Sequence, residues 1–451
     1  MKEVKLEDFG GKADGKFNNT NAFALAFAEL ARSNGGKLTL TKGVWVSGPI
    51  DIPSDTTLEI QEGAEISFLT DPNLYPPAFT RWEGVESYAL HPLVFSSHTK
   101  NIKITGKGTI NGNGEAWWNL RNSKKSSGQT EPKEVYEKVL ASMNPDYKNQ
   151  PGGGGGRELQ FLRPSLLEVS FAENVVIEGV KIIDSPFWTV HPLYVKNLTL
   201  KDLHIENPYT APNTDGIDVD SCEDVLIENC FVSVGDDGIC IKSGSGPDGI
   251  RCNKPTVNVE IKNCTVRNAH GGIVLGSETA AGMSHIHASG CDLSGTDRGI
   301  RIKSRRGRGG DIFDIELRDM VMNDTLCPIA MNMYYKCGIT DQKSPLFSLE
   351  KQPVTSETPR IHDVKIIGCT AKNCKASAGF IVGLPEMPID NLEIRDCNFS
   401  TDETSDRSPM ESDMFYGLPE VTEKSFRIWN APGLKLENVT IEGPKEKFIY
   451  K

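Results

Sequence analysis

Three short segments of the sequence place ionisable side chains directly before a Gly-Ile pair. They are Asn213-Thr214-Asp215-Gly216-Ile217, Asp236-Asp237-Gly238-Ile239 and His270-Gly271-Gly272-Ile273, and Arg298-Gly299-Ile300-Arg301-Ile302-Lys303 continues the series. If the segments occupy successive turns of one parallel sheet, neighbouring edges lie about 4.8 Å apart. Asp215 would then stack on Asp237, and Asp236 on His270. Arg301 and Lys303 would follow one turn later, so the sequence predicts one strip of reactive side chains.

Three neighbouring carboxylates suit acid–base chemistry. Like charges raise the pKa of one member, so one carboxyl can stay protonated as a general acid while another activates water. Glycoside hydrolysis requires this division of roles. Two other readings remain open: the three aspartates could bind Ca²⁺ through their oxygens, or they could only cap turns. The nearby Arg301 and Lys303 speak against the metal, because cations disfavour a bound cation.

The basic side chains of the strip suit an anionic substrate. His270 can hydrogen-bond the carboxyl of Asp236 and help to set its protonation. Arg301 and Lys303 are two residues apart on a strand, so both face the same way, and a guanidinium fork beside a point charge suits a sugar carboxylate. They open a run that holds Arg301, Lys303, Arg305, Arg306 and Arg308. This run is either a solvated loop or a seat for substrate carboxylates.

A repeated strand template predicts the elements that must position the strip. The template is a polar residue, then alternating apolar positions, a small or polar residue, and a buried seventh residue. Its copies begin at Asn101, Asn174, Asn197, Asp224, Asn258, His285, Asp314, Asp363, Asn391 and Gly433. The period of two indicates strands with one buried face, and the regular recurrence indicates a solenoid. We therefore expect an all-β fold, a parallel β-helix.

The seventh position of the template explains the cysteines. It is occupied by Val180, Leu203, Cys230, Cys264, Cys291, Met320, Cys369, Cys397 and Val439. Cysteine alternates there with plain hydrophobic residues, and no Cys-x-x-Cys pair occurs in the sequence. We expect a stacked apolar row of free thiols rather than disulfides or a metal site.

The sequence predicts a single domain over residues 1–451. Segments outside the template complete this domain. Residues 1–50 form a cap region in which Asn18–Ser33 reads as an amphipathic helix, followed by Gly35-Gly36, that covers the open end of the solenoid. Residues 119–160 form a loop insertion ending in the glycines Gly152–Gly156, either a flexible surface insertion or a wall at one end of the groove. For the polar residues 399–426 a flexible surface insertion is favoured.

Charge and hydropathy exclude several classes of partner. The formal net charge of −12 makes nucleic acid or an anionic membrane an unsuitable partner, and no apolar run is long enough to span a bilayer. The first residues, Met1-Lys2-Glu3-Val4-Lys5, lack the apolar stretch of a secretion signal. We expect a monomer that is secreted or periplasmic as a mature form, with a cytoplasmic location as the alternative.

Four of the motifs together resemble the polygalacturonases, glycoside hydrolase family 28. They are Asn213-Thr214-Asp215, Gly235-Asp236-Asp237, His270-Gly271 and Arg301-Ile302-Lys303, in the order of that family. Ala269 replaces the glycine that usually precedes the histidine. The resemblance extends from Asp8-Phe9-Gly10 to the late coils. It implies a right-handed parallel β-helix and hydrolysis of α-linked galacturonic acid residues with inversion, without a cofactor.

The resemblance also implies a role for each motif residue. Asp236 corresponds to the general acid, Asp215 and Asp237 to the pair that positions and deprotonates water, and His270 to the residue that supports the acid. Arg301 and Lys303 correspond to substrate-carboxylate ligands, and Asn213 belongs to the first motif as a substrate-binding residue. Tyr335 matches a family tyrosine near the cleavage site, with Tyr334 as the adjacent alternative.

We expect an exo-acting galacturonidase on homogalacturonan or rhamnogalacturonan oligosaccharides. The segment Gly276-Ser277-Glu278 resembles the exo-acting and bacterial branch, and the 119–160 insertion fits a closed groove. Endo-polygalacturonase and rhamnogalacturonan hydrolase are the nearest alternatives. A calcium-dependent pectate lyase and a non-catalytic β-helical carbohydrate binder are alternatives of other classes.

Overall fold

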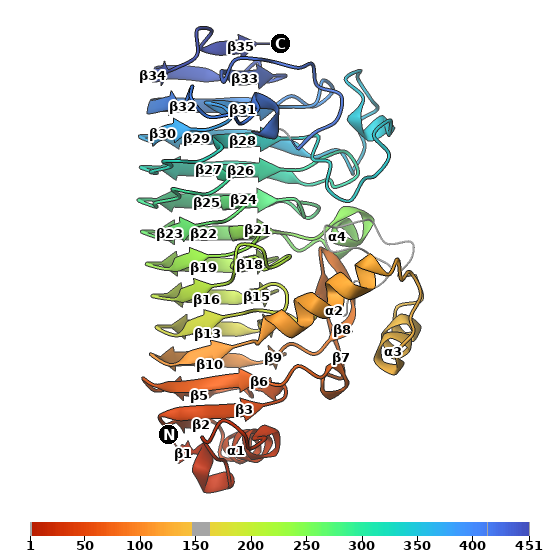
Figure 1. Ribbon diagram of the computed structural model, residues 1–451, viewed down its shortest axis with the longest axis vertical. Coiled ribbons are helices and arrows are strands. Elements are labelled where there is room, and N and C mark those ends of the chain that lie inside the picture. The colour runs from red at the N-terminus through yellow and green to blue at the C-terminus, as the bar shows by residue number, and fades with distance from the viewer. Residues whose placement is uncertain (1, 147–162, 413, 451) are drawn as a thin grey trace. The chain divides into compact units, whose positions relative to one another are not determined.

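The chain folds as a right-handed parallel β-helix, which confirms the predicted fold class. The structure is a computed structural model that describes residues 2–146, 163–412 and 414–450 (Figure 1). Its described residues form two compact units. The first holds residues 2–82, 86–146 and 163–235, and the second holds residues 83–85, 236–412 and 414–450.

Three parallel sheets form the first unit, and each coil adds one strand to a sheet. The first sheet runs β1 (Lys2–Lys5), β2 (Gly36–Leu40), β5 (Thr56–Ile60), β10 (Lys100–Gly106), β13 (Glu173–Glu178), β16 (Lys196–Lys201) and β19 (Glu223–Glu228). The second runs β4 (Ile50–Asp51), β9 (Val94–Ser97), β12 (Leu167–Ser170), β15 (Val190–Leu193) and β18 (Ile217–Asp220). The third runs β3 (Gly43–Ser47), β6 (Ala64–Phe68), β11 (Thr109–Asn111), β14 (Lys181–Ile183), β17 (His204–Glu206) and β20 (Phe231–Ser233).

The second unit continues the same architecture with two long parallel sheets. The template strands β22 (Thr256–Lys262), β25 (Met283–Ser289), β27 (Asp311–Arg318), β29 (Arg360–Ile367) and β32 (Asp390–Thr401) lie side by side in one sheet, in which β32 also pairs with β30 (Thr370–Cys374) and with the template strand β34 (Lys435–Glu442). The other sheet begins with the Gly-Ile strands β21 (Asp237–Lys242), β24 (Gly271–Gly276) and β26 (Arg298–Lys303). It runs on through β28 (Cys327–Asn332), β31 (Gly379–Val382), β33 (Phe426–Trp429) and β35 (Phe448–Tyr450). The short β23 (Thr265–Arg267) follows β22.

The polar positions of the template are explained by the backbone. The first residue of the copy at Asn258 has φ of 59°, and its sixth residue, Asn263, has φ of 52°. Both values lie in the left-handed region, which asparagine, aspartate and glycine tolerate best. Gly290 and Asp319 take the sixth position in the next two copies, with φ of 65° and 56°. The template therefore records two left-handed positions that recur from coil to coil, one near the start of each strand and one directly after its end.

The seventh position forms a buried row, as predicted, in every copy from Val180 to Cys397, whereas Val439 in the last copy is half-buried. All eleven cysteines of the chain are free thiols, and those at this position are fully buried. In the second unit the backbone N–H of Cys264 lies 3.4 Å from the sulfur of Cys291 one coil later. Sulfur in this row serves as an apolar filler, because it sits among aliphatic side chains of the core.

The predicted cap helix is confirmed at the N-terminal end of the first unit. Helix α1 (Thr20–Arg32) lies against the first coil (Figure 1), and Phe23, Phe27 and Leu30 bury its apolar face. The buried side chain of Asn19 precedes the helix and donates to three backbone carbonyls, including that of Val46 at 3.0 Å. The open end of the sheets is thereby covered.

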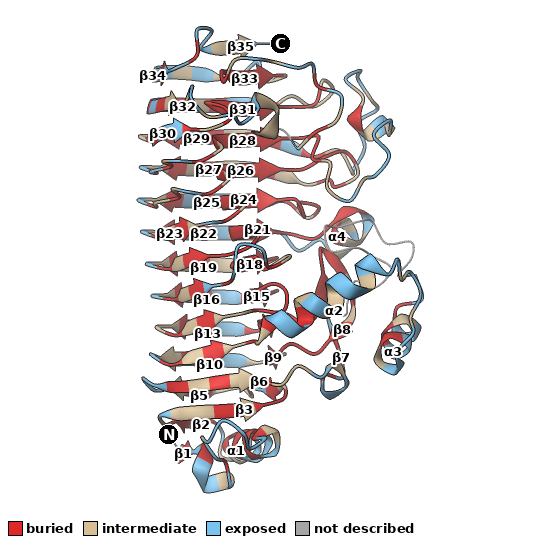
Figure 2. Cartoon of the chain, viewed as in Figure 1, coloured by how far each residue is buried: buried red, intermediate tan, exposed pale blue. Residues whose placement is uncertain are grey.

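The insertion expected at residues 119–160 contains regular structure. Its described part holds the end of α2 (Gly114–Ser126), most of whose residues are exposed, and α3 (Val135–Met143) (Figure 2). The glycines Gly152–Gly156 lie outside the described residues. The remaining helix is α4 (Gly246–Cys252), after β21. None of the described helices has the length and apolar character that crossing a bilayer requires.

A buried ionic cluster in the first unit anchors the hairpin β7 (Pro77–Trp82) and β8 (Val85–Leu90). The guanidinium of Arg81 donates to Asp220 at 2.6 Å, and both side chains are fully buried. His191 lies between Glu168, at 3.2 Å, and Asp220, at 3.8 Å. Burial alone would lower the pKa of His191, but the two carboxylates outweigh it and raise the pKa to about 9. His191 therefore contributes to the stability of the fold through its buried ion pairs with Glu168 and Asp220.

The charge on His191 predicts an alkaline loss of stability. A histidine whose pKa rises on folding stabilises the folded state fully below its unfolded pKa of about 6.5, and loses that contribution as the pH passes 9. The contribution is on the order of 3 kcal/mol. We expect the urea midpoint of the protein to fall between pH 6 and pH 10, and to fall less in His191→Gln. An equal pH dependence in both proteins would contradict this assignment; the exposed His204→Gln serves as the matched control.

Candidate active site

Three Gly-Ile strands of the second unit bring the predicted ionic residues together. Asp237 opens β21, whereas Arg301 and Lys303 lie on β26, with β24 between them in register. Arg301 donates to Oδ1 of Asp237 at 2.7 Å, and Lys303 donates to Oδ2 of the same carboxylate. The glycines of β24 permit this contact across a coil, since a Cβ on Gly271 would lie 2.9 Å from Oδ1 of Asp237 and 3.0 Å from the Arg301 side chain.

Asp237 is held as an anion. Its side chain is almost fully buried, and burial alone would raise its pKa. The charges of Lys303 and Arg301 outweigh burial and hold the pKa of Asp237 well below its usual range. In return, Asp237 keeps the pKa of both cations above their ordinary values in spite of their own burial. With a cation on each oxygen, Asp237 is a poor ligand for a metal ion and a weak base.

Asp236 and His270 form a second and more accessible pair. Nδ1 of His270 lies 3.3 Å from Oδ1 of Asp236, and the side chains are 41% and 23% exposed. The same oxygen accepts from the backbone N–H of Asp237 at 3.0 Å, and the backbone N–H of His270 donates to the carbonyl of Asp236 at 2.8 Å. The hydrogen bond to Asp236 raises the pKa of His270, against the effect of burial. The predicted stacking of His270 on Asp236 is thus confirmed.

The structure separates the two candidate tyrosines. The ring of Tyr335 lies under both cations, with 5.4 Å from its centroid to Arg301 and 5.0 Å to Lys303. Burial raises the pKa of Tyr335 to about 12, so its hydroxyl keeps its proton at neutral pH. Tyr334 instead packs edge-on against Phe415, with 4.5 Å between centroids. Tyr335 is therefore the tyrosine beside the ionic residues.

The first motif lies in the first unit. Asp215 immediately precedes the Gly216 and Ile217 of β18, and its side chain is buried. Its backbone carbonyl accepts from Thr189 at 2.9 Å, which fixes the strand to β15. Asn213 has φ of 55°, and its amide oxygen accepts from Arg163 at 2.8 Å. Its side chain is therefore already engaged by an arginine.

A further buried carboxylate, Glu278, lies two residues after the end of β24, the strand that follows His270. Glu278 accepts from Lys242, the last residue of β21, at 3.1 Å and from Arg308 at 3.3 Å. Burial would raise the pKa of Glu278, but Lys242 and Arg308 hold it well below the usual range. Lys242 also lowers the pKa of Asp237. In the sequence, Glu278 stands out only through resemblance. Lys242 can be found from the strand register, because Lys242, Gly276 and Lys303 take equivalent positions on the neighbouring strands β21, β24 and β26.

The basic run after β26 is not a solvated loop. Arg305, Arg306 and Arg308 are all buried. Arg306 forms an ion pair with Glu386, with 2.6 Å between Nε and Oε1, and Arg308 donates to the hydroxyl of Ser245 at 2.8 Å. Arg306 and Arg308 thus hold loops of the second unit together.

The segment at 399–426 is not a purely flexible insertion, because part of it packs on the ionic residues. The short helix at Pro409–Ser412 is followed by Met414, whose sulfur lies 2.7 Å from a terminal nitrogen of Arg301. Phe415 is buried against Tyr334 and Phe347. The mainly polar composition of the segment did not indicate these few anchoring residues. One of them, Met414, has φ of 43°.

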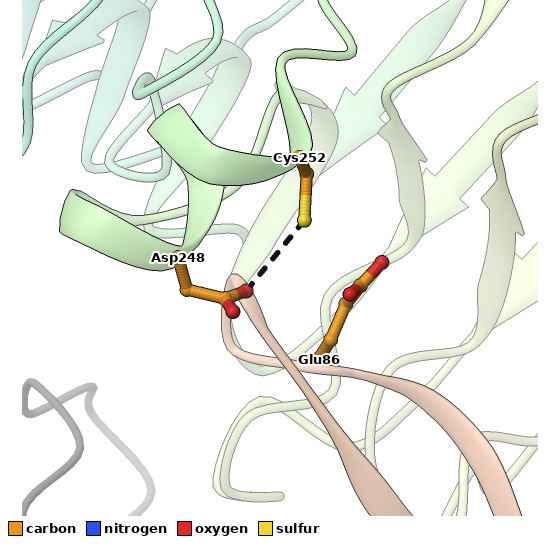
Figure 3. Close-up of side chains that lie close together, drawn as sticks. All are labelled: Glu86, Asp248 and Cys252. Carbon is orange, nitrogen blue, oxygen red and sulfur yellow. Dashed lines mark hydrogen bonds between the residues drawn. The ribbon is translucent and has the colours of Figure 1, made fainter.

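Helix α4 adds acidic and thiol groups that are tied within the helix itself. The thiol of Cys252 donates to Asp248 at 3.9 Å (Figure 3). Arg251 donates to the other carboxylate oxygen of Asp248 at 2.8 Å. The Asp248 side chain thus has a local cation as a partner. These contacts hold the side chain of Asp248 within the short helix.

The arrangement in the second unit places two neighbouring carboxylates in different environments. Asp237 is a permanent anion between two cations, whereas Asp236 shares an accessible hydrogen bond with an imidazole whose pKa is raised. Such a pair can deliver a proton on one side and stabilise developing positive charge on the other.

Comparison with protein families gives an extended match. The model for glycosyl hydrolases family 28 matches residues 44–146 and 153–380. A probable polygalacturonase of Vitis vinifera is 31% identical over 329 residues, which cover 71% of this chain and 60% of the relative. An exo-poly-alpha-D-galacturonosidase of Dickeya chrysanthemi is 27% identical over 339 residues, covering 72% of this chain and 55% of the relative. The chain thus spans little more than half the length of these relatives.

Solved structures give the same result over nearly the whole chain. A hyperthermoactive exopolygalacturonase from Thermotoga maritima superposes with a TM-score of 0.78 and 29% identity, covering 99% of this chain and 93% of that structure. A family 28 exopolygalacturonase from Yersinia enterocolitica gives 0.76 with 23% identity, covering 99% and 76%, and supports the fold.

Proposed function

Because the chain belongs to glycosyl hydrolases family 28, we propose that it hydrolyses α-linked galacturonic acid residues of pectic oligosaccharides, with inversion and from the chain end. The observation that carries this proposal is the pair of adjacent carboxylates in different environments, Asp237 locked between Arg301 and Lys303 and Asp236 hydrogen-bonded to His270. A neutral sugar offers no charge to the buried cations Arg301 and Lys303, whereas galacturonate carries a carboxylate that they can bind.

The proposed reaction uses Asp236 as the general acid. Its carboxyl protonates the glycosidic oxygen as the bond from that oxygen to the anomeric carbon breaks. A proton from solvent then returns to Asp236 through His270, whose ring is 3.3 Å away and partly exposed. The imidazole thus restores the acid for the next turnover.

Water attacks the anomeric carbon from the opposite face, and we assign its deprotonation to Asp215. The assignment follows from the place of Asp215 in the first motif and from the chemistry of Asp237. Two cations stabilise the charged form of Asp237, so it accepts a proton poorly. Asp237 instead orients the water and stabilises positive charge that develops on the sugar ring.

The exo mode rests on the relatives. The Thermotoga exopolygalacturonase is 29% identical over almost the entire chain, and the Dickeya relative is also named as an exo-acting enzyme. We propose that the chain acts on homogalacturonan or rhamnogalacturonan fragments as a monomer in a secreted or periplasmic location. Endo-acting relatives in the same family make the size of the first products the decisive measurement.

We expect early digests of a defined galacturonate oligomer to contain only short products beside the shortened substrate. Chromatography after less than about a tenth of the bonds are cleaved separates the modes, since attack at a chain end cannot yield mid-sized fragments. A ladder of intermediate oligomers would overturn exo action. Release of reducing ends in the presence of a chelator, without the absorbance of an unsaturated product, distinguishes hydrolysis from the elimination reaction of a calcium-dependent lyase.

A further inference from the structure

A small pocket of the second unit is lined by more cations than the four motifs supply. Its walls include Arg298, Arg301, Lys303, Asn332, Tyr335 and Met414. None of the lining residues that the structure describes is acidic. Arg298 lies three residues before Arg301 on β26, and only 7% of its side chain is exposed.

Arg298 is a buried cation with weak counter-charges. Its guanidinium lies 3.5 Å from the carboxylate of Asp297 and donates to the backbone carbonyl of Glu411 at 2.5 Å. Burial and the charge of Arg301 lower the pKa of Arg298. Asp237 is shared by two other cations, so the pocket carries an excess of positive charge. An incoming anion would offset the cost of burying that charge.

Arg301 presents its second nitrogen to a poor acceptor. One terminal nitrogen donates to Asp237, and the other faces the sulfur of Met414 at 2.7 Å. A thioether accepts hydrogen bonds weakly, whereas a carboxylate binds a guanidinium strongly. Met414 also has φ of 43°, a backbone conformation that costs energy for a side chain of this kind.

We propose that Arg298 is a third ligand for the substrate carboxylate. In the absence of substrate, Met414 occupies the position on Arg301 that the carboxylate takes when it binds. This inference rests on the proposed function and deepens it. A galacturonate carboxylate entering the pocket takes the N–H groups that now face sulfur, and Arg298 completes its binding. The side chain of Met414 leaves Arg301 as the carboxylate binds. Specificity for a free carboxylate therefore depends in part on a residue outside the motifs.

The test is calorimetric binding of galacturonate and of neutral galactose to the full chain carrying Asp236→Asn. Adding Arg298→Gln is expected to weaken galacturonate binding about tenfold or more, with galactose unaffected, because charge-assisted hydrogen bonds are lost. Arg298→Lys, which keeps the charge, is expected to lose less. Arg318→Gln is the control, because the partly exposed Arg318 pairs with Glu316 and does not line the pocket. An unchanged galacturonate-to-galactose ratio in Arg298→Gln would overturn the role of Arg298.

Met414→Leu removes the sulfur and keeps the bulk of the side chain. We expect galacturonate to bind about threefold or more tightly, since it no longer competes with the thioether. Met410→Leu is the matched control, because the sulfur of Met410 contacts Arg427 at 3.5 Å and does not line the pocket. Equal or weaker binding in Met414→Leu overturns the placeholder role. Absence of hydrolysis by the parent protein overturns the proposed function alone, because these binding ratios are measured without turnover.

Discussion

Replacing Asp236 with asparagine is expected to lower the turnover of galacturonate oligomers by about 10³-fold to 10⁴-fold, with substrate binding retained. Asparagine keeps the shape of the side chain and cannot donate the proton that the leaving oxygen needs, and general acid catalysis contributes about 10²-fold to 10⁴-fold. Release of reducing sugar from a defined oligomer measures the loss, and calorimetry on the same variant measures binding.

The control for this variant is Asp324→Asn. Asp324 is exposed and has φ of 59°, a conformation that asparagine also accepts. Full activity of Asp324→Asn beside the loss in Asp236→Asn would attribute the effect to proton donation. Activity of Asp236→Asn within tenfold of the parent would remove Asp236 as the acid and would favour a binding protein or a different catalytic group.

Replacing Asp237 with asparagine is expected to damage both activity and stability. Arg301 and Lys303 would remain buried without their carboxylate, and breaking a buried ion pair in this way costs about 3–5 kcal/mol. The water would also lose the anion that orients it. We expect a drop in the melting temperature together with a loss of turnover.

The pH dependence of this effect has a definite sign. A carboxylate with a depressed pKa contributes its stability above the unfolded value of about 3.9 and loses it as the pH falls toward the folded value. The parent should therefore lose stability in acid below about pH 4, and Asp237→Asn should lose less over that range.

Glu278→Gln provides a matched comparison for Asp237→Asn. Glu278 is also a buried carboxylate between two cations, but it is not adjacent to Asp236 in the sequence. We expect a comparable fall in melting temperature and a smaller fall in turnover. Equal losses of turnover in the two variants would contradict the catalytic role of Asp237 and make its contribution structural.

The sequence predicts the local geometry well because each coil repeats the same constraints. Residues with left-handed φ, such as Asn258 near the start of β22 and Asn263 directly after its end, recur at fixed positions, so the alternation between them defines which side chains face inward. The pairing of Asp236 with His270 follows from that register alone. Local rules also identify α1 through its apolar face and flanking polar residues.

Contacts between distant segments could not be predicted in the same way. Met414 reaches Arg301 across more than a hundred residues, and Arg81 reaches Asp220 from a hairpin outside the template. No periodicity links such partners, because loops and hairpins leave the repeat before they return to it. The basic run after β26 was ambiguous for the same reason, since the partners of Arg306 and Arg308 lie on other loops.

The paired left-handed positions of each template strand have a consequence for how such a protein changes over time. Because these positions are single residues such as Asn258 and Asn263, the rungs keep their alignment whatever length of chain joins them. Connections like the one that carries Met414 can grow, shrink or change composition while Asp236 and His270 stay in step. New preferences for sugar chains can therefore arise at the rim without any redesign of the chemistry beneath it.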